Sequence, residues 1–168
     1  SGGVPVNFKN YFVLRVDHDF SFVGSIEDGK LSEGKTSATS NHAMAVVGFH
    51  TKRGEQVNIQ VASSFISDEQ AQRNLKEVEG KTFDEVKSEG RKEWNNILGR
   101  IEVEDDNIDH LRTFYSCLYR SVLFPRSFYE FDEQGNPIHY SPYNGKVLPG
   151  YLFTDTGFWD TFRSLFPL

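Results

Sequence analysis

The residues best suited to chemistry lie at the end of the chain, where Trp159 is followed directly by Asp160. The face of an indole ring packs against the apolar C–H surface of a pyranose, and a neighbouring carboxylate accepts hydrogen bonds from the sugar hydroxyls. Phe158 and Arg163 add a second ring and a cation to the same short segment. This combination is typical of a sugar-binding site.

A pair of carboxylates in this segment has two interpretations. Asp155 and Asp160 are five residues apart, and glycoside hydrolysis needs one carboxyl group as an acid and, in inverting enzymes, a second as a base that activates water. Asp155 also precedes Thr156 and Gly157 and is suited to cap the last helix. Asp160 would then benefit from the helix dipole whatever its function, and Arg163 would form a salt bridge to it one turn later.

The other candidate residues favour structural roles. His18 lies between Asp17 and Asp19, but the histidines have no zinc-ligand spacing, and an exposed strand end explains the triplet better than a metal site. Cys117 lies on the apolar side of a predicted helix and is expected in the core. Trp94 lies on a helical apolar stripe, where packing is its expected role.

Composition narrows the function classes. The chain has 168 residues, with 24 acidic and 18 basic side chains and a net charge of -6. Without a basic stripe, nucleic-acid binding is not expected, because it depends on neutralising phosphates. The sequence contains no apolar run of about 18 residues, which is the length that a membrane span needs. The N-terminus also lacks the charged start and apolar core of a signal peptide.

Period-two alternation predicts β structure in the first part of the chain. Strands are expected at residues 11–16 and 56–61, with a mostly apolar strand at 43–49. The turn at 50–55 is predicted to close a hairpin between the strands at 43–49 and 56–61. Residues 27–37 are predicted to form a loop.

After residue 66 the period changes to that of helices. Ser67 and Thr82 are predicted to cap two helices, and Asp106 or Asn107 a third that ends before Pro125. The second and third helices carry apolar stripes that are expected to face a core: Phe83, Val86, Trp94 and Ile97 on one, and Ile108, Leu111, Tyr115, Leu118 and Val122 on the other. Residues 127–149 read as a turn-rich loop. The last helix is expected to begin near Thr156 or Gly157 and to run toward Phe166.

The last hundred residues resemble a known family. The motifs are Phe-Tyr-Ser-Cys-Leu-Tyr-Arg-Ser-Val-Leu-Phe-Pro-Arg at 114–126, Tyr-Ser-Pro-Tyr-Asn-Gly-Lys-Val-Leu-Pro-Gly-Tyr at 140–151, and Thr-Asp-Thr-Gly-Phe-Trp-Asp-Thr-Phe-Arg at 154–163. Together they are similar to glycoside hydrolase family 92. The resemblance implies a calcium-dependent exo-α-mannosidase that inverts the anomeric centre, built from a β-sandwich followed by an (α/α)6 barrel.

The resemblance also implies how the chain is organised. The expected fold is α+β by segment: residues 1–65 form the C-terminal part of a β-sandwich, 66–104 are linker helices, and 105–168 start the barrel. The chain would be an internal segment of a longer, secreted or periplasmic protein, and the remainder of that polypeptide would be its partner. Alone, it is expected to be marginally stable and inactive.

Site residues carry over only in part. The resemblance implies that Trp159 and Asp160 bind the terminal mannose of a glycan, with Phe158 and Arg163 as weaker candidates, while the catalytic carboxyl groups and most calcium ligands lie outside the chain. No catalytic or metal-binding residue is therefore assigned here. A non-catalytic carbohydrate-binding module and another (α/α)6 carbohydrate-active enzyme remain open as alternatives.

Overall fold

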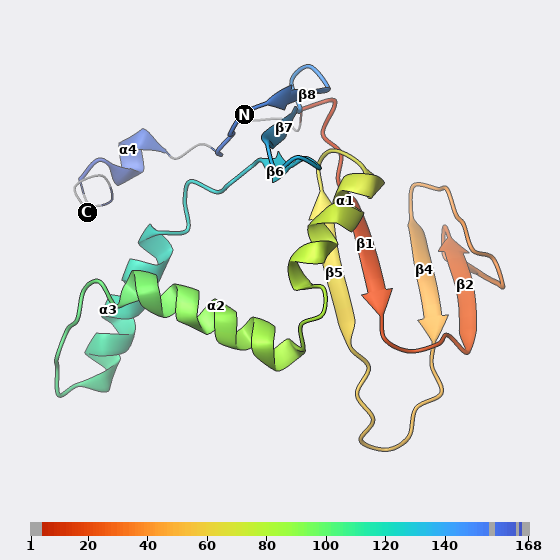
Figure 1. Cartoon of the computed structure of the whole chain (residues 1–168), viewed down its shortest axis with the longest axis horizontal. Helices are drawn as coiled ribbons and strands as arrows, with labels where there is room; N and C mark the ends of the chain where they lie inside the picture. Colours follow the sequence, from red (N-terminus) through yellow and green to blue (C-terminus); the bar gives the residue numbers. More distant parts are fainter. Residues whose placement is uncertain (1–4, 155–156, 164, 166–168) are drawn as a thin grey trace. The chain divides into compact units, whose positions relative to one another are not determined.

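The computed structural model describes residues 5–154, 157–163 and 165, and only the backbone of Phe158 and Asp160. The chain divides into two compact units, unit 1 (residues 1–13 and 62–168) and unit 2 (residues 14–61). The strands, labelled in Figure 1, are β1 (Tyr11–Val16), β2 (Phe22–Glu27), β3 (Lys30–Glu33), β4 (Ala43–Gly48), β5 (Ile59–Ser64), β6 (Glu130–Phe131), β7 (Pro137–Ser141) and β8 (Lys146–Pro149). The helices are α1 (Asp68–Asn74), the 3-10 helix η1 (Leu75–Val78), α2 (Phe83–Leu98), α3 (Ile108–Ser121) and α4 (Phe158–Thr161).

The chain is thus mixed in structure, with small sheets and few helices. Strands β1 and β5 form a two-stranded sheet, and the other strands form two three-stranded sheets in the orders β3-β2-β4 and β6-β7-β8. Among the described residues, no helix is long and apolar enough to cross a membrane.

Unit 2 contains the sheet with β2 at its centre. Both neighbours of β2 run antiparallel to it, and Asp28 and Gly29 make the turn into β3 with φ of 47° and 85°. Residues 27–37, which contain this turn and β3, were predicted as a loop because their turn signals are strong and β3 is short. The predicted hairpin across residues 50–55 is wrong, since β4 pairs with β2 and β5 with β1. A local turn signal does not determine with which strand each flanking strand forms its backbone hydrogen bonds.

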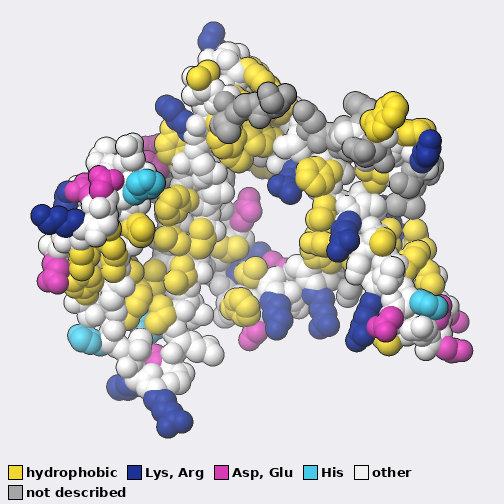
Figure 2. Space-filling model, turned by 180° about the vertical axis from the view of Figure 1, so that it is seen from behind, with side chains coloured by type: hydrophobic (Ala, Val, Ile, Leu, Met, Phe, Trp, Pro, Cys, Tyr) yellow, Lys and Arg dark blue, Asp and Glu magenta, His cyan; other side chains and the backbone are white. Residues whose placement is uncertain are grey.

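The sheet of β1 and β5 has an uncovered apolar face. Strand β1 has the predicted bounds, whereas β5 begins three residues later than predicted. The side chains of Phe12, Leu14, Ile59 and Val61 are 64%, 54%, 56% and 60% exposed, and Figure 2 shows hydrophobic side chains reaching the surface at many places on the face in view. A sheet face of this kind is ordinarily covered by another layer in a folded domain.

The best-packed part of unit 1 surrounds α1. The Ser67 hydroxyl accepts a hydrogen bond from the Gln70 amide at 3.2 Å, which confirms the predicted helix cap. Ala71 and Leu75 are 0% and 2% exposed, and Ser64, at the end of β5, is 2% exposed. These residues form a small packed core around α1.

The β6-β7-β8 sheet occupies the segment predicted as a turn-rich loop. Both predicted turns are present: the Asp132 carboxylate accepts hydrogen bonds from the amides of Gln134 and Asn136 at 2.9 and 2.8 Å, and Gly145 turns β7 into β8 with a φ of 69°. The strands between the turns are two to five residues long. Such short strands give little periodicity to detect.

Helices α2 and α3 begin where the sequence predicts. Thr82 and Glu85 form a complete capping box, in which the Thr82 amide donates to the Glu85 carboxylate at 2.7 Å and the Glu85 amide donates to the Thr82 hydroxyl at 3.3 Å. The Asn107 side chain caps α3. The rings of Trp94 and Tyr119 lie 4.6 Å apart between their centroids, so the predicted packing role of Trp94 is confirmed.

Within the part of the chain that the structure describes, the predicted core-facing stripes of these two helices are not buried. Neither helix contains a buried residue, and Phe83 and Ile108 are 73% and 56% exposed. Cys117, which was predicted to lie in a core, is exposed. Two helices in contact cover only a narrow strip of each other. Amphipathic periodicity identifies the apolar face of a helix, but it does not show which other element covers that face.

Candidate functional site

A backbone ladder leads to the segment that carries the predicted sugar-binding residues. The Phe128 amide donates to the Leu152 carbonyl at 2.8 Å, and the Thr154 amide donates to the Arg126 carbonyl at 2.9 Å. The Thr154 hydroxyl accepts from the Arg126 amide, also at 2.9 Å. The chain is therefore fixed on both sides of Phe153 before it continues into α4.

Helix α4 presents Trp159 to solvent within the described chain. It is a single turn whose N-cap is Gly157, with no side-chain hydrogen bond at the cap, and the Thr161 hydroxyl donates to the Gly157 carbonyl at 2.7 Å. The Trp159 side chain is 86% exposed, so the ring is not committed to packing here. Asp155, the predicted alternative cap, lies outside the described residues.

The other predicted site residues are described only in part. The side chains of Phe158 and Asp160 lie outside the described atoms, so the predicted Asp160–Arg163 salt bridge stays a prediction. The Arg163 guanidinium lies 4.9 Å from the centroid of the Phe162 ring, a cation–π contact that the sequence analysis did not anticipate.

Four aromatic rings on the paired segments before α4 form a surface that the sequence analysis missed. The Tyr129 ring meets Phe131, Tyr151 and Phe153 edge to face, with centroid distances of 5.5, 4.8 and 5.5 Å. Tyr151 is 62% exposed and Phe153 50% exposed. Alternation of aromatic residues at 129 and 131 and at 151 and 153 is the signal that could have found this face.

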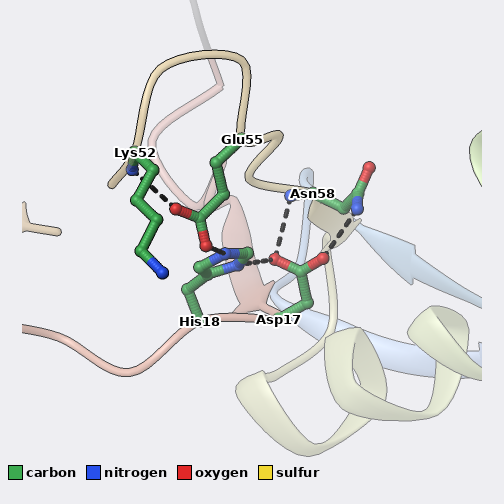
Figure 3. Close-up of polar contacts among 5 residues, drawn as sticks. All are labelled: Asp17, His18, Lys52, Glu55 and Asn58. Atoms are coloured by element: carbon green, nitrogen blue, oxygen red, sulfur yellow. Dashed lines mark hydrogen bonds and ion pairs between the residues drawn. The ribbon is translucent and has the colours of Figure 1, made fainter. Parts of the chain in front are cut away.

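A polar cluster in unit 2 joins the end of β1 to the loop before β5 (Figure 3). His18 Nδ1 lies 2.5 Å from an Asp17 carboxylate oxygen, and His18 Nε2 lies 3.3 Å from Glu55 Oε1. The second Asp17 oxygen accepts from the Asn58 side-chain amide at 2.6 Å, and the Glu55 carboxylate also accepts from the Lys52 amide at 2.7 Å. The cluster therefore fixes the loop to the strand.

This cluster does not make a metal site. Among the described residues, no group of three or more His, Cys, Asp or Glu side chains is placed to hold a metal ion. The Asp17 oxygens are instead occupied by hydrogen bonds from Asn58 and His18. The contacts of Asp17 and His18 are hydrogen bonds that join the end of β1 to the loop before β5.

The hydrogen bonds of the cluster shift the pKa values of its members. Hydrogen bonds from the Asn58 side chain and His18 lower the pKa of Asp17 from 3.8 to about 2. The hydrogen bond to Asp17, assisted by Glu55, raises the pKa of His18 above 6.5. The hydrogen bonds from the Lys52 amide and His18 lower the pKa of Glu55 below 4.5. Each charged form is favoured by a partner of opposite charge or by a donor.

We expect the cluster to show a defined pH window. The His18 contribution to stability is complete below pH 6.5 and is lost as the pH rises through the raised pKa of His18, whereas the Asp17 contribution is complete above pH 3.8 and is lost as the pH falls toward about 2. In Asp17→Asn, the NMR titration midpoint of the His18 ring should fall toward 6.5. The matched variant Asp19→Asn should leave it nearly unchanged. An unaltered midpoint in Asp17→Asn would contradict the assignment.

Comparison with known proteins identifies the class to which this chain belongs. The model of the glycosyl hydrolase family 92 catalytic domain matches residues 70–168, which include α2, α3, the β6-β7-β8 sheet and α4. The chain therefore belongs to glycoside hydrolase family 92. An uncharacterized secreted glycosidase from Arthroderma benhamiae is 32% identical over 78 residues, which cover 44% of this chain and 10% of that protein.

Solved structures of the same family match nearly the whole chain. The family 92 inverting mannosidase from Bacteroides thetaiotaomicron VPI-5482 is 48% identical, with a TM-score of 0.91, over 99% of this chain and 23% of that protein. A second family 92 α-mannosidase from Bacteroides thetaiotaomicron, solved in complex with mannoimidazole, is 26% identical, with a TM-score of 0.76, over 93% of this chain and 21% of that protein. The chain thus spans less than a quarter of the length of these enzymes.

Proposed function

We propose that this chain is part of a larger mannosidase that releases terminal mannose from α-mannosides and N-glycans with inversion at the anomeric carbon. The observation that carries the proposal is the 48% identity over 99% of the chain to a protein described as an inverting mannosidase. The membership of residues 70–168 in the family's catalytic domain supports it independently.

The same proposal assigns roles to the segments. Residues 1–65 contribute to a β-sandwich, residues 66–104 form linker helices, and residues 105–168 begin an (α/α)6 barrel. The order of elements supports this division, because β1 to β5 all precede α1, and α2 and α3 follow it. The uncovered apolar faces of the β1–β5 sheet and of α2 and α3 would be covered by the rest of the polypeptide.

In this enzyme the chain contributes to substrate binding rather than to bond cleavage. Trp159 would lie against the C–H face of the terminal mannose and Asp160 would accept hydrogen bonds from its hydroxyls, with Phe158 and Arg163 as neighbouring contributors. The 86% exposure of Trp159 supports a role in which its ring is available to another partner. The acid and base carboxyl groups of an inverting enzyme, about 6.5–9.5 Å apart, are proposed to come from later segments.

Calcium dependence is also part of the proposal, with the ion bound outside this chain. The described residues do not fit a metal site, because they bring together no suitable group of ligands. Bound calcium would help to hold and distort the terminal mannose. A secreted or periplasmic location is proposed as well, and the description of the Arthroderma benhamiae relative as secreted supports it.

The test is hydrolysis of an α-linked mannobiose by the natural full-length protein, followed by NMR. We expect β-mannose to appear first, because inversion of an α-linkage gives the β-anomer, and we expect a calcium chelator to abolish turnover and added calcium to restore it. The 168-residue chain alone should show no turnover.

Four outcomes would contradict parts of the proposal separately. Initial release of α-mannose would exclude inversion, and activity that persists with the chelator would exclude the calcium requirement. Binding of α-mannosides without hydrolysis by the full-length protein would favour a non-catalytic carbohydrate-binding module. Turnover of a different sugar would favour another (α/α)6 carbohydrate-active enzyme.

A further inference from the structure

We propose that Glu130 is a positioning residue for the mannose-binding segment, acting through the strand ladder that leads to Trp159. The inference rests on the proposed function of Trp159, but the contacts that carry it are independent of the sugar. Glu130 opens β6 and is the point at which the ladder is tied to the packed region around α1.

The carboxylate of Glu130 bridges the residue that follows β5 and the last residue of α1. One oxygen accepts a hydrogen bond from the Phe65 amide at 2.9 Å, and the other accepts from the Asn74 side chain at 2.7 Å. The Asn74 side-chain nitrogen also donates to the Ser63 carbonyl at 2.9 Å. A single side chain therefore contacts residues that are 65 and 56 positions away in sequence.

The region to which Glu130 is tied is the most buried part of the described chain. Ser64 and Gln70 are each 2% exposed, and the Ser64 hydroxyl accepts from the Ile66 amide at 2.9 Å. The Gln70 side chain donates to the Phe131 carbonyl at 2.8 Å, which fixes β6 a second time. Such a region moves less than the exposed ladder and provides a stable reference for it.

The alternation of side chains separates anchoring from the aromatic surface. Phe128 lies two residues before Glu130, and its ring stacks on Phe65 with a centroid distance of 4.3 Å. The Tyr129 ring instead contacts the rings of Phe131, Tyr151 and Phe153. Glu130 and Phe128 thus attach one face of the ladder to the core and leave the other face free.

The ladder ends close to the candidate site in sequence. Thr154, its last described residue, precedes Trp159 by five residues, a separation that even a fully extended chain spans in at most about 18 Å. A change in the position or order of the ladder is therefore expected to reach the Trp159 segment. Because a loosened segment must be ordered when the sugar binds, and this ordering costs affinity, a loosened anchor should weaken mannose binding measurably.

The experiment compares Glu130→Ala with Glu133→Gln in the natural full-length protein. Glu133 is the matched control, because it is three residues away and pairs with Arg73 at the surface, with its side chain 72% exposed. In Glu130→Ala we expect the Kd for mannoimidazole and the KM for an α-mannoside to rise about 10-fold or more, with a smaller change in kcat. Glu133→Gln should leave these values unchanged.

Two further variants distinguish positioning from general destabilisation. Glu130→Gln keeps a carbonyl oxygen for the Phe65 amide and should lose less affinity than Glu130→Ala, and it provides a test if the alanine variant does not fold. In a Trp159→Ala background, Glu130→Ala should add little to the Kd, because the two changes act on the same contact. If the losses in mannoimidazole affinity caused by Glu130→Ala and Trp159→Ala are fully additive in the double variant, the proposal is overturned.

A measurement that needs no sugar separates this inference from the proposed function. With 5-fluorotryptophan incorporated, the 19F signal of Trp159, assigned by its loss in Trp159→Phe, should shift or broaden in Glu130→Ala but not in Glu133→Gln. A shifted signal without mannoimidazole binding by the wild-type protein would support positioning and contradict the mannose site. An unshifted signal would overturn the positioning role whatever the ligand.

Discussion

Trp159→Ala in the natural full-length protein is expected to lower kcat/KM for α-mannosides by roughly 30-fold or more. Truncation of an aromatic residue at the centre of a binding site commonly costs about 2 kcal/mol or more, and each 1.36 kcal/mol is a factor of ten. Trp159 is 86% exposed in the described chain and its proposed partner is the sugar, so the loss should appear in Kd and KM. Steady-state kinetics and mannoimidazole binding would measure it.

The chain offers a matched tryptophan as the control. Trp94 packs on Tyr119 at 4.6 Å between ring centroids, so Trp94→Phe should lower the thermal midpoint slightly and leave the affinity for mannoimidazole unchanged. Trp159→Phe should lose less activity than Trp159→Ala, because a smaller ring still offers a stacking face. Normal kinetics in Trp159→Ala would remove the residue from the proposed mannose site.

Leu75→Ala is expected to be the most destabilising single change in the described core. Leu75 is 2% exposed, and truncating a buried leucine costs about 2–5 kcal/mol through lost burial and the cavity left behind. Because the 168-residue chain is expected to be marginally stable, this loss should unfold the region around α1. Urea denaturation followed by circular dichroism would measure the free energy of unfolding.

Phe83→Ala tests whether the burial of a side chain determines how much its truncation lowers the free energy of unfolding. Phe83 is a larger side chain at the start of α2 but is 73% exposed, so its truncation should change the free energy of unfolding of the isolated chain by much less. Similar losses for the two variants would show that the packing around Leu75 is not the main source of stability.

Local signals in the sequence predicted the ends of the helices well. The capping side chains of Ser67, Thr82 and Asn107 form their predicted hydrogen bonds, because a cap is completed within three residues and does not depend on the rest of the fold. The turns at 132–137 and 143–146 were predictable for the same reason. The family motifs of the last hundred residues, which the comparison confirms, indicated the class of enzyme.

Strand partners and burial could not be predicted in this way. The turn at residues 50–55 suggested a local hairpin, but β4 pairs with the earlier strand β2. Cys117 lies on an amphipathic helix and is nevertheless exposed. Periodicity shows which face of an element is apolar, and only the tertiary structure shows whether another element covers it.

The sequence by itself determined the helix starts and the main turns, because each depends on neighbours close along the chain. Only the tertiary structure decided the strand order and the contacts of Glu130. Glu130 meets Phe65 and Asn74 across 65 and 56 residues, and hydrogen bonds between positions so far apart leave no periodic trace in the sequence.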